Sequence, residues 1–498
     1  GYSKNLRHDI FYKIQQFSFK NIDTFSTGSL VTRLTNDIQQ VQNLIMMGLR
    51  MMLRAPGMFL GALVMAFWMN AELAAVILVV IPLLTAAIVW ILRTAYPRFT
   101  AMQKALDTLN SGIQEVLTNV RVVKSFVRED YEEKRFADTN RELKEAGLRA
   151  LKIVIATMPV MMFAMNVTTL AVVWFGGNLI IGGRMAVGDL TAFTTYIVQI
   201  LMSLMMLSMV FLQSSRAMAS IRRIDEVLDE PIDLSDENAS QKDRKVEKGR
   251  VEFKDVSFSY CEGGEPVLSH ISLTAEPGET IGILGATGSG KTSLVQLIPR
   301  LYDVTEGSVR VDGIDVREYS LKNLRDGVGM VLQKNVLFSG TIEENLRWGD
   351  ETATEEEVRR AAVYAQADSF VNSFAEGYKT EMGQGGVNVS GGQKQRLCIA
   401  RALLKKPKIL ILDDSTSAVD TATEAAIRTA FREDLKDTTK FIIAQRLSSL
   451  EYADRILVLE DGRIIGEGTQ EKLLASCEAY REIYETQYGK RADGEVMA

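Results

Sequence analysis

Residues 280–298 read Thr280-Ile-Gly-Ile-Leu-Gly-Ala-Thr-Gly-Ser-Gly-Lys-Thr-Ser-Leu-Val-Gln-Leu-Ile298, and this stretch decides the fold of the second half of the chain. Its centre, Gly285–Ser293, has the spacing G-x-x-x-x-G-K-[ST] of a phosphate-binding P-loop. Thr280–Leu284 predicts a short buried strand, and Ser293–Ile298 predicts a helix that stops at Pro299. Strand, glycine loop and helix in this order are the context that the motif requires. The alternative is a glycine-rich turn that resembles the motif by chance.

The residues of this loop predict how phosphate is held. Its glycines let the backbone turn tightly and direct N–H groups at phosphate oxygens. The helix N-terminus adds a partial positive charge, Lys291 adds a full one, and the Thr292 hydroxyl can ligate Mg²⁺. The predicted phosphate-binding residues are Gly285, Ala286, Thr287, Gly288, Ser289, Gly290, Lys291, Thr292 and Ser293.

Length and composition indicate two kinds of domain. The chain has 498 residues, enough for two or more domains, and its net charge of −6 gives no indication of nucleic-acid binding. Hydrophobic residues make up 47% of the chain, but the long uncharged runs all lie in the first half. Cys261, Cys398 and Cys477 are scattered through the second half, which predicts reduced thiols in a cytosolic domain.

Four uncharged runs predict membrane-spanning helices. A span takes roughly 20 apolar residues, which the last three runs reach, and Gly48–Leu53 can extend the first. The alternative, buried helices of a soluble protein, requires core helices to stay uncharged for unusually long stretches. The four runs are Ala55–Asn70, Leu73–Leu92, Ile153–Gly183 and Leu190–Gln213.

The positions of lysine and arginine predict the orientation of these spans. Segments 1–54, 93–152 and 214–250 are rich in both residues. The turn at Asn70–Glu72 has neither, and the loop Gly182–Asp189 has only one arginine. The positive-inside rule therefore places the three basic segments in the cytoplasm and the two turns outside, as in a multi-pass protein of the cytoplasmic membrane.

Methionines recur at helical spacing in two of the runs, so that each set falls on one helix face. Methionine adapts to many shapes, and one interpretation is an apolar cavity for drugs or lipids. Ordinary helix–helix or lipid contact is the other. The two sets are Met158, Met161, Met162 and Met165, and Met202, Met205, Met206 and Met209.

A charged linker over residues 226–249 precedes a segment, Arg250–Tyr260, that alternates like an edge strand. Tyr260 ends this strand, where it can stack on a base or fill a sheet edge. Further along, Gln333 follows the strand-like Met330–Leu332 and could reach Mg²⁺.

Two later strands also end in polar side chains, and one helix begins with a conspicuous turn. Ile409–Asp414 closes on two carboxylates, of which Asp413 suits Mg²⁺ coordination and Asp414 suits a general base. Lys440–Gln445 is a buried strand that ends in an amide. A helix expected to run on through Ala402 begins with N–H groups that suit a second phosphate contact. The residues of this turn are Ser390, Gly391, Gly392 and Gln393.

In this order, the motifs resemble an ABC transporter of the exporter type, with membrane and nucleotide-binding domains fused in one chain. The resemblance covers essentially all of the sequence. Tyr260 matches the A-loop, Gly285–Ser293 matches Walker A and Gln333 matches the Q-loop. Thr380–Gly386 matches the segment before the signature, and Val389–Gln393 matches the signature, with valine in place of the usual leucine. Ile409–Asp413 matches Walker B, and Ser417–Asp420 matches the D-loop, which includes Asp420. Phe17–Gly28 and Asn119–Phe126 resemble the two cytoplasmic loops whose coupling helices contact the nucleotide domains.

The resemblance implies an architecture and a function. An all-α transmembrane domain is expected over residues 1–225, a linker over 226–249, an α/β P-loop domain with a helical subdomain over 250–488 and a tail over 489–498. The family has six spans per chain, so the sequence is expected to begin near the cytoplasmic end of the second. The implied activity is ATP-driven, Mg²⁺-dependent export of hydrophobic or amphipathic small molecules.

Two catalytic positions depart from the family pattern. Its catalytic glutamate is Asp414 here, and its switch histidine is Gln445. Aspartate sets the carboxylate back by about an ångström, a misplacement that can cost ~10²-fold in rate. Glutamine can hydrogen-bond a phosphate but cannot carry positive charge to it. With Gln333, these residues form a catalytic half-site that is expected to be impaired.

ATP sites in this family form between two chains, so an impaired half-site beside an intact signature resembles one subunit of the heterodimeric bacterial multidrug exporters. The expected partners are a second half-transporter chain, the lipid bilayer and a hydrophobic substrate, with no nucleic acid. The alternatives are a homodimer that tolerates Asp414 and Gln445, including a homodimeric lipid flippase, and a nucleotide-gated or regulatory subunit that hydrolyses little ATP.

Overall fold

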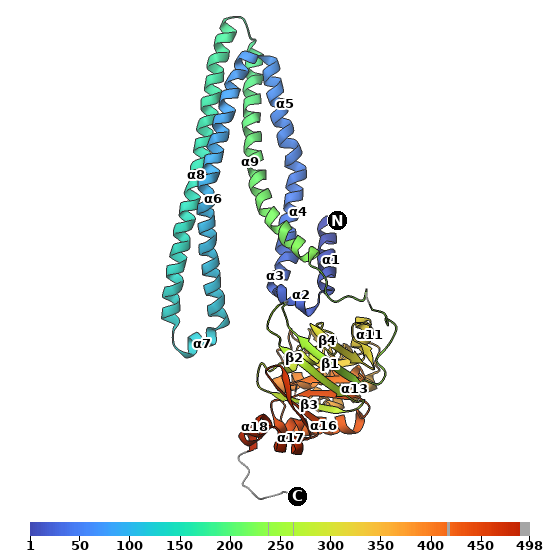
Figure 1. Cartoon of the computed structure of the whole chain (residues 1–498). Coiled ribbons are helices and arrows are strands. Elements are labelled where there is room, and N and C mark those ends of the chain that lie inside the picture. The colour runs from blue at the N-terminus through green and yellow to red at the C-terminus, as the bar shows by residue number, and fades with distance from the viewer. Residues whose placement is uncertain (238, 262, 416–418, 489–498) are drawn as a thin grey trace. The chain divides into compact units, whose positions relative to one another are not determined.

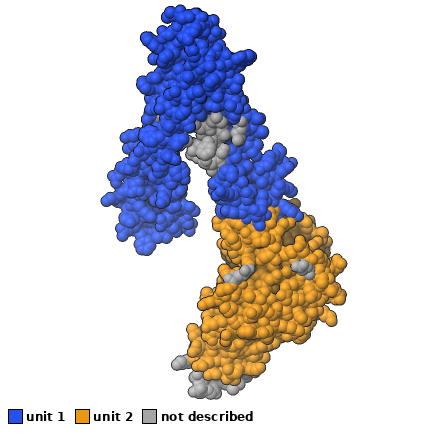
Figure 2. All heavy atoms as spheres, turned by 45° about the horizontal axis from the view of Figure 1, so that its top comes forward, with its two compact units in different colours: residues 1–12, 28–229 blue, residues 13–27, 230–498 orange. Residues whose placement is uncertain are grey.

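The computed structural model describes residues 1–237, 239–261, 263–415 and 419–488. It divides into two compact units (Figure 2). Unit 1 comprises residues 1–12 and 28–229, and unit 2 comprises residues 13–27 and the chain from residue 230 onward. A short segment near the N-terminus therefore belongs with the second half of the chain.

Unit 1 is built from long helices. Helices α6 and α8 run side by side and are joined by the short α7, and α9 lies beside α5 (Figure 1). The helices from the N-terminus to the linker, apart from α2, are α1 (Tyr2–Gln15), α3 (Thr27–Thr32), α4 (Ile38–Met47), α5 (Leu53–Met69), α6 (Ala71–Thr118), α7 (Val120–Ser125), α8 (Glu129–Ile181) and α9 (Val187–Asp229).

The four expected spans are confirmed as helices long and apolar enough to cross a membrane. The first is continuous because π-helical turns at Arg33–Asp37 and Gly48–Met52 join α3, α4 and α5. Apolar side chains from four helices, including Ala66, Leu73 and Phe193, form the core of the unit. The candidate spans are Thr27–Met69, Ala71–Thr118, Met162–Ile181 and Val187–Leu204.

The methionine sets are described only in part. Met162 and Met202 are exposed, and Met165 packs against the core of the unit. The structure does not describe the side chains of Met158, Met161, Met205 and Met209. The interpretation of a methionine-lined cavity therefore stays a prediction.

A partly buried ionic cluster joins the first span to α9. The side chain of Asp37 is 3% exposed. Its carboxylate accepts hydrogen bonds from Arg223 Nε at 2.8 Å and from Ser220 Oγ at 2.8 Å. One turn before Asp37, Arg33 pairs with Glu226 of α9 at 2.8 Å. We call these five residues the Asp37 cluster.

Arg223→Met is expected to lower the melting temperature of the detergent-solubilised protein by several degrees. The substitution leaves the buried Asp37 carboxylate without the hydrogen bonds of Arg223, and an unsatisfied buried acceptor typically costs about 1–3 kcal/mol. Glu226→Gln is the matched control, because that carboxylate is 57% exposed and its pairing is worth little. Equal melting temperatures for the two variants would contradict a stabilising role for the Asp37 cluster.

Unit 2 contains a parallel core sheet. The strand orders of its three sheets are β12-β11-β3-β10-β9-β6, β2-β1-β4-β5 and β7-β8. In the largest sheet, β3 lies between β10 and β11 and is parallel to both, so the carboxyl ends of these strands share one edge. The strands are β1 (Val251–Phe258), β2 (Leu268–Ala275), β3 (Thr280–Gly285), β4 (Glu306–Val311), β5 (Ile314–Asp315), β6 (Val328–Val331), β7 (Gly340–Thr341), β8 (Glu381–Met382), β9 (Ile409–Asp413), β10 (Thr439–Ile443), β11 (Arg455–Glu460) and β12 (Arg463–Gly468).

The helices of unit 2 cover this sheet and build a second core. One core joins the sheets through residues such as Phe253 and Phe441, and another lies among helices around Leu346, Ala362 and Leu403. The expected fold class, a helical membrane domain followed by an α/β domain, is confirmed. The helices are α2 (Phe19–Thr24), α10 (Lys291–Gln296), α11 (Leu321–Asp326), α12 (Ile342–Arg347), α13 (Glu355–Tyr364), α14 (Asp368–Val371), α15 (Gly391–Leu404), α16 (Thr421–Asp434), α17 (Gln470–Ser476) and α18 (Glu478–Tyr488).

Several local expectations need correction. β1 is not an edge strand, because it pairs with β2 on one side and β4 on the other. The alternation of apolar and polar residues in β1 arises because one face of the strand packs on the core. The position of β1 within the sheet depends instead on pairing with distant segments, which the alternation does not reveal. Helix α10 runs from Lys291 to Gln296 rather than from Ser293 to Ile298, whereas α15 runs through Ala402 as expected and ends at Leu404. The D-loop residue Ser417 and the tail 489–498 lie outside the described residues.

Candidate nucleotide site

The P-loop connects β3 to α10 and has the backbone that its glycines allow. Gly288 and Gly290 have φ angles of 87° and 95°, in the left-handed region that glycine adopts without strain. A Cβ at Gly290 would lie 2.8 Å from Leu268 Cδ2, so no other residue fits there without a shift. Ala286 and Thr287 are exposed, which leaves the loop open to a ligand.

Lys291 places a cation inside this loop. Its ammonium donates hydrogen bonds to Gly285 O at 2.9 Å and to Ala286 O at 2.6 Å. Burial lowers the pKa of Lys291, and the nearby Asp413 and Asp414 carboxylates oppose that shift. A partly buried ammonium beside open backbone N–H groups suits the charge of a nucleotide phosphate.

The residues expected to hold Mg²⁺ carry the kinds of oxygen atom that this metal binds. Thr292 Oγ1 donates to Asp413 Oδ2 at 2.9 Å, so a hydroxyl and a carboxylate already meet. Burial raises the pKa of Asp413, because a charged carboxylate is costly away from water. A cation bound beside it would stabilise the charged form. Oxygen ligands of this kind, completed by substrate phosphates, are those that Mg²⁺ prefers. The described residues hold no group of three or more His, Cys, Asp or Glu that could bind a metal without the nucleotide.

The three expected catalytic residues lie together. Gln445 Nε2 donates to Asp414 Oδ2 at 2.8 Å, and Gln333 also hydrogen-bonds the Asp414 carboxylate. Burial raises the pKa of Asp414, and these two amides oppose the rise. The φ angle of Asp414 is 46°, and its N–H donates to Ile443 O at 3.0 Å, which fixes the residue at the end of β9.

Tyr260 lies beside the helix of the P-loop. Its hydroxyl is 2.8 Å from Ser293 Oγ, and its ring contacts Tyr302 edge-on with centroids 5.1 Å apart. The hydroxyl of Tyr260 thus places this residue next to the P-loop helix, as its predicted role in nucleotide binding requires. Motif analysis missed Tyr302, although an aromatic residue so soon after Pro299 was the available signal.

The signature turn is intact and exposed. Ser390 caps α15, with Gln393 N donating to Ser390 Oγ at 3.3 Å and Ser390 N donating to Gln393 Oε1 at 2.9 Å. Among the described residues, no hydrogen bond joins this turn to the P-loop. The N–H groups of Ser390 and Gln393 are used within the turn, so those of Gly391 and Gly392 are the donors that it can offer to another ligand. Asp420 is also exposed and caps α16 by accepting from Thr423 N at 2.9 Å.

Helix α2 is anchored within unit 2. Asn21 Nδ2 donates to Glu230 Oε1 and to Pro231 O, each at 3.0 Å. The Tyr302 hydroxyl donates to Asp23 Oδ2 at 2.9 Å, and burial raises the pKa of that phenol. Tyr302 therefore contacts both the A-loop residue Tyr260 and the first expected coupling helix.

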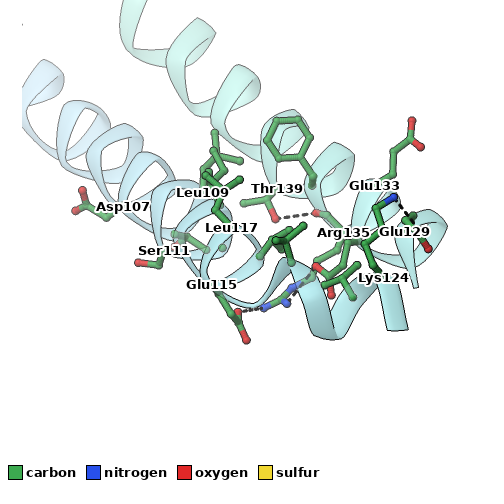
Figure 3. Close-up of a pocket in the computed structure, with 18 of the residues that line it drawn as sticks. Asp107, Leu109, Ser111, Glu115, Leu117, Lys124, Glu129, Glu133, Arg135 and Thr139 are labelled. Atoms are coloured by element: carbon green, nitrogen blue, oxygen red, sulfur yellow. Dashed lines mark hydrogen bonds and ion pairs between the residues drawn. The ribbon is translucent and has the colours of Figure 1, made fainter. Parts of the chain in front are cut away.

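The second expected coupling helix closes the hairpin of α6 and α8. A cavity of about 770 Å³ lies between these helices and α7 (Figure 3). Arg135 pairs with Glu115 across the cavity at 3.2 Å, and Lys124 pairs with Glu129 at 2.9 Å. The tip beyond α7 is apolar and open, with Val127 82% exposed.

Comparison with known proteins identifies the family. The family described as ABC transporter transmembrane region matches residues 1–204, and that described as ABC transporter matches residues 268–417. An uncharacterized ABC transporter ATP-binding protein, YfiB of Bacillus subtilis (strain 168), is 44% identical over 490 residues, which cover 98% of this chain and 85% of that protein. The chain belongs to the ABC transporter family.

Other relatives of this ABC transporter have more specific names. The ATP-dependent lipid A-core flippase of Desulfotalea psychrophila (strain LSv54 / DSM 12343) is 35% identical over 97% of this chain and 84% of that protein. The fatty acid ABC transporter ATP-binding/permease protein of Mycobacterium tuberculosis (strain CDC 1551 / Oshkosh) is 36% identical over 96% of this chain and 75% of that protein. A solved structure, a bacterial Atm1-family ABC exporter with ATP bound, has a TM-score of 0.81 at 28% identity and covers 99% of this chain and 86% of that one. An ABC transporter of this architecture couples ATP hydrolysis to transport across a membrane.

Proposed function

We propose that this ABC transporter chain is one half of a heterodimeric exporter of the cytoplasmic membrane, with one slow and one fast ATP site. The observation that carries the proposal is an aspartate at the catalytic position, held by Gln445 and Gln333, in a chain whose signature turn is intact. In this account, the site with Lys291 and Asp414 retains ATP, and Ser390–Gln393 complete a faster site on the partner.

The proposed cargo is a hydrophobic or amphipathic small molecule, such as a drug or a lipid. The spans are apolar, and relatives are named for fatty acids and lipid A-core, which supports a lipid-like cargo. The test is ATP-dependent, vanadate-sensitive movement of a lipophilic dye into inside-out vesicles. ATP binding without such movement would instead favour a nucleotide-gated or regulatory subunit.

A homodimeric lipid flippase is the second candidate, supported by the flippase relative. The two candidates differ in what the purified chain does alone. A heterodimer subunit is expected to hydrolyse ATP slowly until its partner is added. Brisk turnover by the chain alone would favour the homodimer.

In either case, the chain's own residues suggest how ATP binding reaches the membrane helices. Lys291 and the loop N–H groups would bind phosphate, and Thr292 and Asp413 would hold a Mg²⁺ ion that would neutralise part of the phosphate charge. Closure of two nucleotide domains on ATP depends on contacts made only in the closed state. Because α2 is bonded through Asp23 to Tyr302 and through Asn21 to Pro231, motion of unit 2 carries α2 with it.

Tyr302→Phe is expected to reduce transport per ATP hydrolysed by about 2- to 10-fold, the effect of one hydrogen bond of about 0.5–1.5 kcal/mol. The phenylalanine keeps the ring against Tyr260 and removes only the bond to Asp23. The measurement is the ratio of dye transport to phosphate release in vesicles.

Tyr364→Phe is the matched control, because it removes another tyrosine–aspartate hydrogen bond, to Asp434, at an exposed position of the same unit. Equal ratios for both variants and the wild type would show that the bond between Tyr302 and Asp23 does not transmit the motion.

A further inference from the structure

A basic pocket of about 240 Å³ lies in unit 2 between α16 and the amino-terminal ends of β3 and β10. It does not include the P-loop or the signature turn. Its lining is dominated by positive side chains around one tyrosine, with a single carboxylate. The polar residues that matter are Arg428, Arg432, Lys436, Lys440, Tyr452 and Asp454.

Lys440 is the most unusual of these residues. It lies in β10, a central strand of the parallel sheet, and is only 3% exposed. Among the described residues, its ammonium makes one hydrogen bond, to Thr438 O at 2.8 Å. An ammonium has three donors, so one acceptor leaves this buried charge poorly compensated. Burial lowers the pKa of Lys440, while Asp454 and Asp437 oppose the shift.

The two arginines lie over the same aromatic ring. The guanidinium carbons of Arg428 and Arg432 lie 5.5 Å and 5.9 Å from the centroid of Tyr452. Arg428 also donates from Nε and Nη1 to the backbone oxygens of Glu424 and Ser448, which holds its guanidinium in place. Arg432 has a carboxylate partner, Glu433, only at 3.9 Å. Arg428 is therefore held in place before an anion binds, whereas Arg432 is exposed and its guanidinium can still turn towards one.

The one lining carboxylate does not neutralise the pocket. Asp454 Oδ2 accepts from Thr280 N at 2.8 Å, so part of its hydrogen-bonding capacity is used by the backbone. Four cationic side chains therefore face one carboxylate in this pocket. The volume is below the roughly 300 Å³ at which pockets for drug-sized ligands begin, which favours a small ligand.

We propose that this pocket binds a phosphate-bearing small anion, at a site separate from the P-loop. Arginine matches phosphate oxygens with paired N–H donors, and the Lys440 ammonium supplies charge from the strand side. Free phosphate, diphosphate and the phosphate chain of a nucleotide share this chemistry. Bound anion would tie α16, which begins directly after Asp420, to the strand that leads to Gln445.

The test measures melting temperature of the full-length chain in detergent during titration with inorganic phosphate, pyrophosphate or ADP. All proteins carry Lys291→Ala, which weakens binding at the P-loop. Pyrophosphate is expected to raise the melting temperature, and adding Lys440→Met or Arg432→Ala is expected to weaken its apparent affinity at least 10-fold. A response to ADP alone that is lost in the same variants would assign the site to a nucleotide.

A loss of anion binding in these variants can be distinguished from a folding defect. Lys440→Met removes a poorly compensated buried charge, so its melting temperature without ligand is expected to equal or exceed that of the parent. Arg432→Ala changes an exposed side chain and serves as the second variant. No response to any of the three anions, or a response that both variants leave unchanged, would overturn the proposal.

Discussion

Asp414→Glu is expected to raise ATP hydrolysis by the purified chain by about 10²-fold, because it moves the carboxylate outward by about an ångström towards the attacking water. The aspartate is held at the end of β9, where its backbone N–H is bonded to Ile443 O. The longer side chain therefore extends from a fixed position. The measurement is vanadate-sensitive phosphate release by the chain alone.

Asp414→Asn is the matched control, since it keeps the size of the side chain and removes the base. It is expected to leave the slow rate unchanged or lower it. Adding Gln445→His to Asp414→Glu is expected to raise the rate further, because histidinium can stabilise charge on the transferring phosphate. A rate for Asp414→Glu no higher than wild type would show that carboxylate reach does not limit this half-site.

Ser390→Arg is expected to reduce ATP turnover of the complex with its partner at least 10²-fold. Under the proposed function, the turn at the start of α15 presents donors to the partner's ATP, and loss of one transition-state donor typically costs ~10²–10³-fold. Under the proposed asymmetry, Asp414→Asn in the same complex changes turnover little, since the faster site uses the partner's base. The measurement is steady-state phosphate release by the co-purified pair.

A homodimer would give a different result. In a homodimer, Ser390 and Asp414 belong to equivalent sites, so both substitutions would reduce turnover to a similar extent. The contrast between the two variants therefore tests the asymmetry without knowledge of the transported molecule. Circular dichroism of each variant serves to exclude unfolding as the cause of the loss.

The sequence predicted what depends on local pattern. The P-loop, the two carboxylates at the end of β9 and the uncharged runs of the spans are short-range signals, and the structure places them on the expected strands and helices. Local patterns could not predict which distant segments pair with one another. The interior position of β1 follows from its pairing with β4, and the contact between Tyr302 and Asp23 joins residues far apart in the chain. The basic pocket likewise depends on α16 folding over the start of β10.

The assignment of residues 13–27 to unit 2 has a practical consequence for hybrid proteins. Exchanging nucleotide-binding halves between relatives at a junction near residue 230 would separate Asp23 and Asn21 from Tyr302 and Pro231. A working chimaera therefore has to transplant two pieces of sequence from the same donor. In natural lineages, the same constraint predicts that substitutions at residues 23 and 302 are inherited together.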